Sequence, residues 1–192
     1  MTVMPNKLVL WTGEKHSGKT TSAAKLVKIA RDEGFNVTGV LSLSIYHNSK
    51  LVGFDTLDLR NENRTPLARR KINASKTGAF TFITDGLKLG NAALSSTATK
   101  SADLIIIDEF GPLELNSRGW RKSVDSLIAS SNAVILLVVR QELAENVGQL
   151  YADVPCRRLA ATESKSTDQV IKMLKYRRQS QRGEKCSSSM EC

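Results

Sequence analysis

The sequence is poor in the residues that mark disulfide scaffolds and zinc-binding domains. It has three cysteines and two histidines among 192 residues. The cysteines, Cys156, Cys186 and Cys192, are odd in number and form no Cys-x-x-Cys pair, which argues against a disulfide framework and against a zinc site. His16 and His47 stand alone in the sequence, and we interpret them as ordinary polar residues rather than metal ligands.

Long apolar segments are also missing. No apolar run approaches the roughly 20 residues that a membrane-spanning helix needs. No charged-then-apolar leader resembles a signal peptide. We therefore expect a cytoplasmic protein that does not enter a membrane, and we expect it to be a monomer. A chain of this length can bury roughly 70% of its unfolded surface in one core, which favours a single domain over residues 1–182.

The formal net charge is +9, and it is concentrated in two segments. Residues 60–76 hold six basic residues and one acidic residue, and residues 172–192 hold six basic and two acidic residues. A basic surface can attract nucleotides or nucleic acid. No DNA- or RNA-binding motif accompanies the charge, so the sequence favours a solvated surface and a disordered, serine-rich tail over residues 183–192.

A glycine-rich segment near the N-terminus carries the most specific chemical signal. Its glycines allow backbone amides to approach a phosphate closely. Lys19 can contact the β and γ phosphates, the Thr20 hydroxyl can bind Mg²⁺, and Thr21 completes the expected nucleotide-binding set. The segment fits the phosphate-binding loop pattern of Gly, four free residues, Gly, Lys and then Ser or Thr, with Gly13, Glu14, Lys15, His16, Ser17, Gly18, Lys19 and Thr20.

The segments around this loop have the order that it requires. Residues 7–11 form a short apolar run typical of a buried strand, and residues 22–31 have the apolar spacing of a helix that turns Lys25 and Lys28 outward. Gly34 lies where this helix is expected to stop. Because a strand, the loop and a helix follow one another, the sequence predicts that this loop binds a nucleotide.

The rest of the chain alternates between strand and helix patterns. Strands are predicted at 36–46, 51–59, 79–84, 103–108, 133–139 and 157–161, and helices at 87–99, 117–130 and 167–182. The first two of these strands flank a turn at 47–50 and are predicted to form an antiparallel hairpin. Residues 60–75, which contain Pro66, are predicted to be a basic loop. The predicted fold class is α/β, a P-loop type of mostly parallel sheet sandwiched by helices, with an antiparallel hairpin.

A second chemical signal lies far downstream of the loop. Four apolar residues at 104–107 precede Asp108, and Glu109 comes next. A carboxylate at the carboxyl end of a buried parallel strand, beside the phosphate loop, can hold Mg²⁺ together with Thr20. Glu109 can orient a water molecule and accept its proton during attack on the γ phosphorus, although a surface salt bridge is its alternative role. The sequence therefore predicts a magnesium–nucleotide site in which Lys19 and Glu109 are catalytic.

Two arginines are candidates for stabilising charge on the transferred phosphoryl group. Arg140 follows a predicted strand and should lie at the carboxyl edge of the sheet, whereas Arg69 lies in the predicted basic loop, which could close over the nucleotide. A structural or surface role stays open for each. Glu114 could contact a ribose or an internal arginine, or stabilise the start of the next helix. Asp55 and Asp58 are interpreted as solvent-facing strand residues.

Four blocks of the sequence are informative when taken together. They are the phosphate loop at 13–21, Gly-Phe-Asp-Thr-Leu-Asp-Leu at 53–59, Pro-Leu-Ala-Arg at 66–69 and Asp-Glu-Phe-Gly-Pro-Leu-Glu-Leu at 108–115. Together they resemble the small nucleoside-triphosphatase family known from thermophiles and from a human cancer-related enzyme. The resemblance covers about residues 7–174. It is most specific in the last block, where the family commonly has Asp-Glu-Ile-Gly-Pro-Met-Glu-Leu.

The resemblance implies a compact P-loop fold, broad hydrolysis of nucleoside triphosphates and a requirement for Mg²⁺. On that basis, Lys19 and Thr20 would hold phosphate and metal, Asp108 the metal and Glu109 the attacking water. The sequence departs from the family at positions 15 and 16, where the family often has Pro-Gly and this chain has a lysine and a histidine. The basic tail after about Arg178 matches no part of the family pattern.

Three functions stay open at the level of the sequence. Hydrolysis of ATP, GTP and other nucleoside triphosphates leads, because Glu109 can serve as a base and no acceptor site is evident. A nucleotide or small-molecule kinase is the second. The third is a nucleotide-switched accessory protein with a nucleic-acid or protein partner. No base-reading motif is visible, so the sequence does not define a preferred nucleobase.

Overall fold

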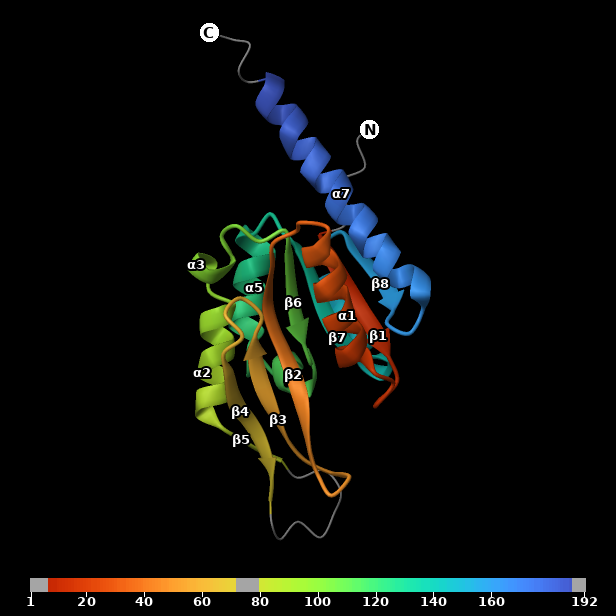
Figure 1. Ribbon diagram of the computed structural model, residues 1–192. Helices are drawn as coiled ribbons and strands as arrows, with labels where there is room; N and C mark the ends of the chain where they lie inside the picture. Colours follow the sequence, from red (N-terminus) through yellow and green to blue (C-terminus); the bar gives the residue numbers. More distant parts are fainter. Residues whose placement is uncertain (1–6, 72–79, 188–192) are drawn as a thin grey trace.

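The computed structural model describes residues 7–71 and 80–187. Within them, eight strands form a single sheet in the order β5-β4-β3-β2-β6-β7-β1-β8 (Figure 1). The parallel part contains β2 (Val37–His47), β6 (Leu104–Asp108), β7 (Val134–Arg140), β1 (Leu8–Gly13) and β8 (Cys156–Ala160). Beyond β2 the sheet continues as an antiparallel wing of β3 (Lys50–Asp58), β4 (Arg64–Arg70) and β5 (Phe80–Phe82).

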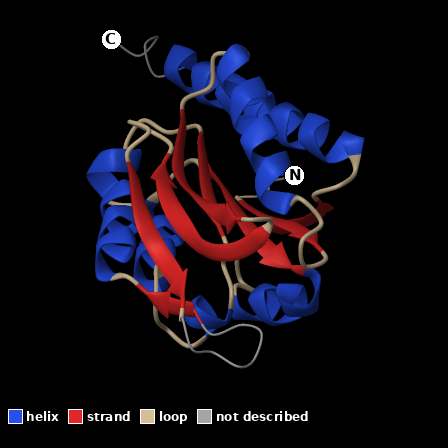
Figure 2. Ribbon diagram, turned by 60° about the horizontal axis from the view of Figure 1, so that its bottom comes forward, coloured by secondary structure: helices blue, strands red, loops and turns tan. Residues whose placement is uncertain are grey.

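Helices cover both faces of this sheet, which confirms the predicted α/β class (Figure 2). On one face lie α1 (Lys19–Asp32) and α7 (Ser164–Ser187), whose apolar residues share a core with β1 and β2. On the other face lie α2 (Thr84–Ala93), α5 (Arg121–Ser130) and α6 (Ala144–Leu150). The buried positions of α1 recur every three or four residues, as an amphipathic helix requires, at Ala23, Leu26, Val27 and Ala30.

The central parallel strands are apolar along their whole length because both of their faces are covered. Every residue of β6 is buried, and so is every residue of β7 before Arg140. Of the helices that the structure describes, none is both long and apolar enough to cross a bilayer. The carboxyl ends of the parallel strands therefore meet at one rim of a buried sheet, where ligands bind in folds of this kind.

Residues 64–70 correct the prediction of a basic loop, because they form β4 between β3 and β5. Pro66 fits there because the register of β3 and β4 shifts: Phe54 pairs with Ala68 and Asp55 pairs with Pro66. A bulge tolerates proline, which has no N–H group for the ladder. Residues 60–63 of the predicted loop connect β3 to β4, whereas residues 72–75 lie outside the described residues, as does residue 79 of the strand predicted before α2.

The prediction that Asp55 and Asp58 face solvent is also wrong. Their exposed fractions are 8% and 2%. Asp55 accepts hydrogen bonds from the guanidinium groups of Arg64 (2.7 Å) and Arg69 (2.6 Å). Asp58 accepts the backbone N–H of Arg60 at 2.8 Å. These positions would be open in an isolated hairpin, and they become covered because β4 and its connection add to the edge of β3.

Helix boundaries differ from the prediction where side chains interrupt the helical pattern. The helix predicted at 87–99 is divided into α2 and α3 (Ser96–Thr99), because Ser95 caps α3 by accepting the backbone N–H of Ala98 at 3.3 Å. The helix predicted at 117–130 begins only at Arg121, and the short α4 (Pro112–Leu115) comes before it. Neither α6 nor the 3-10 turn η1 (Gln141–Leu143) was predicted.

The last helix, α7, is longer than predicted. It begins at Ser164 and continues past Arg182 to Ser187, so part of the segment that was expected to be disordered is helical. Its Lys, Arg, Gln and Glu residues are good helix formers, which favours this extension. Arg178 ties α7 to the body by donating to the Gly34 carbonyl (2.9 Å) and to Asp103 (3.1 Å). Figure 1 shows the end of α7 projecting beyond the sheet.

Candidate active site

The phosphate-binding loop connects β1 directly to α1. Gly13 is the last residue of β1 and lies in register with Arg140 of β7. Gly18 is the N-cap residue of α1 and has a φ of 83°, a left-handed conformation that glycine adopts at low cost. Because glycine offers no capping side chain, the first amide groups of α1 are left to an anion at this helix end.

The backbone of the loop is left-handed at position 16, where this chain has a histidine. His16 has a φ of 62°, which is left-handed and unfavourable for a residue with a Cβ atom. The family often has glycine there, and glycine would adopt this conformation without strain. At Gly13 an added Cβ atom would lie 2.7 Å from Ser17 Oγ, so the loop is also too tight there for a larger residue.

Lys19, the first residue of α1, lies at the centre of a group of charged side chains. Its Nζ atom donates a hydrogen bond of 2.6 Å to the Glu14 carbonyl, within the same loop. Partial burial lowers the pKa of Lys19. Its charged neighbours act in both directions: Glu109 raises this pKa and Arg140 lowers it, while Asp108 and Glu142 also raise it. Residues from β1–α1, β6 and β7 therefore converge on one point.

Asp108 is fully buried at the carboxyl end of β6. Its Oδ2 atom accepts the backbone N–H of Ser42 at 3.1 Å, and the Ser42 hydroxyl donates to the Asp108 carbonyl at 3.3 Å. Burial, together with the neighbouring charge of Glu109, raises the pKa of Asp108 to about 7. The Thr20 hydroxyl and the backbone amides of Ser42 and Glu109 act against this rise. Thr20 is therefore close enough to Asp108 for both to contact one ligand.

The residues around Asp108 fit a magnesium ion. Its Oδ1 atom is buried and has no hydrogen-bond partner among the described residues, and Thr20 adds a hydroxyl oxygen beside it. Mg²⁺ prefers such oxygen ligands and is usually held by one or two protein groups together with substrate phosphates. Across the described parts of the chain, no three His, Cys, Asp or Glu side chains are grouped to hold a metal. The ion would accordingly depend on these two side chains, phosphate oxygens and water.

Glu109 follows Asp108 but is turned in another direction. Its φ of 67° is left-handed, and its side chain is exposed between two buried residues. The next residue, Phe110, returns to the core and donates its N–H to the Val138 carbonyl at 3.0 Å. This kink directs the Glu109 carboxylate out of the sheet, near Lys19, where a water molecule can reach it.

The two candidate arginines are separated by the structure. Arg140 ends β7, which lies between β6 and β1, so it faces the rim near Lys19 and in register with Gly13. Glu142, two residues after Arg140, was missed because no pattern in the sequence indicates the turn η1.

Arg69 does not lie in a mobile loop, which corrects the sequence prediction. It belongs to β4, and its guanidinium donates to Asp55 (2.6 Å) and to the carbonyls of Phe54 (2.8 Å) and Ala68 (2.9 Å). Four strands, β3, β2, β6 and β7, separate β4 from β1 in the sheet. Arg69 is therefore not brought together with Lys19 and has a structural role in the wing.

Glu114 stabilises the start of α4, one of the two alternatives that the sequence left open. Its carboxylate is buried and accepts the backbone N–H groups of Gly111 (3.0 Å) and Trp120 (3.3 Å). Burial raises the pKa of Glu114, while these two amides act to lower it. Glu114 therefore fixes the chain after Glu109 rather than contacting a ligand.

Comparison with known proteins agrees with this site. A protein-family model described as NTPase matches residues 8–173, which include every residue of the site described above. The chain belongs to this NTPase family. Among its NTPase relatives is the nucleoside-triphosphatase THEP1 of Methanopyrus kandleri, which is 30% identical over 70% of this chain and 74% of the relative. The THEP1 of Methanocaldococcus jannaschii is 31% identical over 73% of this chain and 84% of the relative.

Solved structures share the fold. The solution structure of a human cancer-related nucleoside triphosphatase has a TM-score of 0.66 at 18% identity, covering 90% of this chain and 96% of that one. The crystal structure of THEP1 from the hyperthermophile Aquifex aeolicus has the same TM-score and identity, covering 87% and 98%. The basic end of α7 lies beyond the matched NTPase region, which ends at residue 173.

Proposed function

We propose that this protein hydrolyses nucleoside 5'-triphosphates, ATP and GTP among them, to the diphosphate and phosphate with Mg²⁺ as cofactor. The observation that carries this proposal is the convergence of Lys19, Thr20, Asp108 and Glu109 at one rim of the sheet. Family membership and the names of the THEP1 relatives support it. Glu109 favours hydrolysis over transfer, because it is an exposed carboxylate beside the lysine that would contact the γ phosphate.

The proposed reaction is attack of water on the γ phosphorus. The loop amides and Lys19 bind the β and γ phosphates, and Lys19 exchanges its contact with the Glu14 carbonyl for one with phosphate. Thr20 and Asp108 would hold Mg²⁺, which supplies positive charge to the phosphate oxygens. The Glu109 carboxylate orients the water and accepts its proton, while the bond from the γ phosphorus to the β–γ bridging oxygen breaks. Arg140 is the arginine positioned to stabilise the developing charge.

A phosphate-release panel tests this function. ATP, GTP, CTP and UTP are each incubated with the protein, with Mg²⁺ or with EDTA, and with or without nucleoside monophosphates as acceptors. We expect phosphate release from ATP and GTP that needs Mg²⁺ and no acceptor. Transfer of the phosphoryl group to an acceptor, without release of free phosphate, would show that the protein is a kinase and not a hydrolase. Tight nucleotide binding with no turnover would instead indicate a nucleotide-switched accessory protein.

A further inference from the structure

The outer side of α1 and α7 carries positive charge that no carboxylate neutralises. The two helices cover the same face of the sheet and meet at the end of α1, where Lys175 Nζ lies 2.8 Å from a carboxylate oxygen of Glu33 (Figure 1). Four further lysines on these helices are exposed, and no carboxylate of the described residues lies within salt-bridge distance of any of them: Lys25, Lys28, Lys165 and Lys172. Their charges are available to a ligand that lies along the helices.

The arginines of α7 differ from these lysines because they hold the helix on the body. Arg177 donates to the Asn132 carbonyl at 2.6 Å. Arg178 donates to the Gly34 carbonyl at 2.9 Å and to Asp103 at 3.1 Å. The arginine contacts account for how α7 is attached, whereas the free lysines make no such contact with the body.

Tyr176 adds an exposed aromatic ring beside these lysines. It lies four residues after Lys172, so the two side chains are neighbours on one side of α7. The exposed fraction of Tyr176 is 46%, whereas the apolar residues just before it are buried against the sheet: Val170, Ile171, Met173 and Leu174. The lysine–tyrosine face is the set of Lys25, Lys28, Lys165, Lys172 and Tyr176.

This combination of lysines with an exposed aromatic ring suits a single strand of nucleic acid. The lysines contact phosphates, and an unpaired base stacks on the ring whatever its sequence. A duplex would offer phosphates to the lysines, but its bases are already stacked on one another and leave Tyr176 without a partner. A lipid surface would need a broad apolar face. On the two helices, Ile29 and Tyr176 are the large apolar side chains that the structure shows exposed.

Asp168 favours RNA over DNA at this face. It is exposed and lies three residues after Lys165 and four before Lys172, on the same side of α7. An ionised carboxylate accepts hydrogen bonds and donates none, and it repels phosphate. The ribose 2′-hydroxyl of RNA can donate to it, whereas deoxyribose has no such group. The same carboxylate therefore disfavours a DNA strand more than an RNA strand.

We infer that the lysine–tyrosine face binds single-stranded RNA. Phosphates accept hydrogen bonds from the lysines, one base stacks on Tyr176, and a ribose hydroxyl donates to Asp168. Tyr176 directly follows Lys175, whose contact with Glu33 places it at the far end of α1 from the phosphate loop. The 14 residues of α1 put its two ends about 20 Å apart. RNA and a nucleoside triphosphate can therefore be bound at the same time.

Fluorescence anisotropy of a labelled twelve-nucleotide oligouridylate tests the inference with the full chain. The phosphate loop is first filled with a non-hydrolysable ATP analogue and Mg²⁺, so that RNA phosphates cannot bind there. We expect saturable binding, about tenfold tighter than that of a deoxyuridine strand or an RNA duplex of the same length.

The other ligands decide between the alternatives. Equal affinity for the duplex would overturn the single-strand assignment, and equal affinity for the deoxyuridine strand would overturn the choice of RNA. Binding to phosphatidylserine vesicles without binding to the oligouridylate would overturn the inference in favour of a membrane surface.

Two substitutions separate stacking from charge. Tyr176→Ala should weaken RNA binding about tenfold and leave its salt dependence unchanged, because the substitution removes base stacking alone. Lys172→Gln should instead reduce the slope of log K against log salt by roughly 0.7, the share of one phosphate on a single strand. Unchanged affinity in both variants would overturn the inference.

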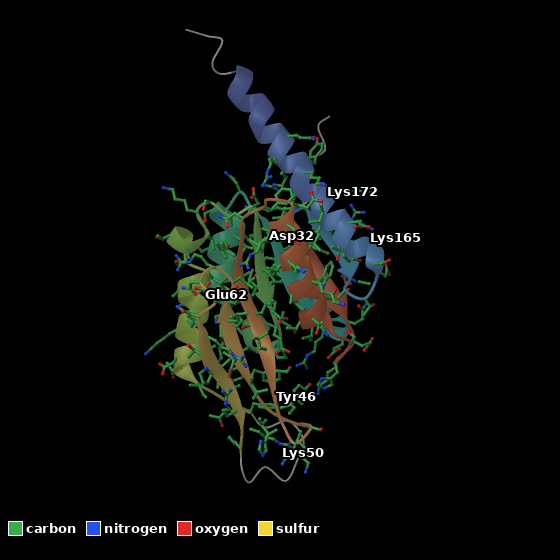
Figure 3. The ribbon with its side chains drawn as sticks, in the orientation of Figure 1. Asp32, Tyr46, Lys50, Glu62, Lys165 and Lys172 are labelled. Carbon is green, nitrogen blue, oxygen red and sulfur yellow. The ribbon has the colours of Figure 1, made fainter. Side chains whose placement is uncertain are left out.

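The matched controls are Tyr46→Ala and Lys50→Gln. They remove an exposed tyrosine and an exposed lysine at the β2–β3 hairpin, which Figure 3 shows far from Lys172. Losses equal to those of Tyr176→Ala and Lys172→Gln would show general attraction to a basic protein and overturn the inference. Thermal melting checks the fold of each variant, and a failure of hydrolysis would leave these binding results unaffected.

Asp168→Ala tests the preference for RNA. Removal of the carboxylate should tighten binding of the deoxyuridine strand and narrow its difference from the oligouridylate, because the repulsion and the hydroxyl acceptor are both lost. An unchanged difference between the two strands would overturn the role of Asp168.

Discussion

At the scale of single residues, Asp108 and Glu109 are adjacent carboxylates in opposite environments. Asp108 is fully buried, with a pKa raised to about 7 by burial and by the charge of its neighbour. Glu109 is exposed because a left-handed φ of 67° turns its side chain out of the strand direction. Two such environments suit two roles, a metal ligand in the protein and a base in contact with water.

Glu109→Gln tests the role of the base. The amide keeps the size of the side chain but cannot accept a proton from water, so single-turnover hydrolysis should fall by roughly 10²–10⁴-fold. Binding of Mg–ATP, measured by titration, should change little, because Thr20 and Asp108 are intact. Near-normal turnover would remove Glu109 from the mechanism. Loss of binding together with turnover would make it a metal-site or structural residue instead.

Asp108→Asn should weaken Mg–nucleotide binding and yet stabilise the metal-free protein at alkaline pH. Asp108 has a folded-state pKa of about 7 against an ordinary value of 3.8. Burial of this carboxyl therefore opposes folding once the unfolded chain ionises: the cost is absent below about pH 4, grows between about pH 4 and pH 7, and is constant above about pH 7. In urea unfolding with EDTA, the variant should be more stable at pH 8 by a few kcal/mol, on the order of 1.4 kcal/mol per unit of pKa.

The same comparison at pH 5 serves as the control for Asp108→Asn. At that pH the wild-type carboxyl is protonated in the folded state, so the gain in stability should be smaller than at pH 8. A variant that is less stable than wild type at pH 8 would contradict the conclusion that the ionised Asp108 carboxylate opposes folding.

At the scale of elements, the wing depends on the ion pairs of Asp55. Burial acts to raise the pKa of Asp55, but hydrogen bonds from Arg69 and Arg64 outweigh it and hold the pKa below its ordinary value. The stabilisation is therefore present above about pH 4 and lost as the pH falls through the depressed pKa. Because both arginines are partly exposed, Asp55→Asn should lower stability at pH 7 by only about 1–2 kcal/mol.

Urea unfolding at pH 7 and pH 3 checks this prediction, and the difference between Asp55→Asn and wild type should narrow at pH 3. Asp85→Asn is the matched control, since Asp85 and its partner Lys88 are both exposed. Turnover should stay near wild type, because four strands separate β4 from β1. If Asp55→Asn lowers the free energy of unfolding equally at pH 7 and pH 3, the substitution has removed packing rather than the charge of Asp55.

At the scale of the whole molecule, α7 has a part that packs on the sheet and a part that projects from it. Truncation after Arg182 should leave the melting temperature and hydrolysis nearly unchanged, because the contacts of Arg177 and Arg178 with the body are retained. Truncation after Leu174 is the comparison, since it removes both arginines and the ring contact with Phe35. A large fall in the melting temperature of the variant that ends at Arg182 would show that residues 183–192 join the core.

The parts of the candidate site that are formed by consecutive residues could be predicted from the sequence. The loop from Gly13 to Thr20 is local, because consecutive residues carry the amides and the lysine that would contact phosphate and the hydroxyl that would contact Mg²⁺. The positions of Asp108 and Glu109 could also be predicted locally. A buried strand has a run of apolar residues, and the first charged residue after the run marks its end. The α/β class followed from the same alternation of apolar runs and amphipathic helices.

The tertiary structure decided what depends on pairing between distant segments. The position of β7 between β6 and β1 brings Arg140 and Glu142 toward Lys19, and the addition of β4 to β3 buries Asp55 and assigns Arg69 to the wing. Local sequence fixes which residues can form a strand or a loop. Burial and charge pairing depend on which other segments cover them, and this is settled only when the whole sheet assembles.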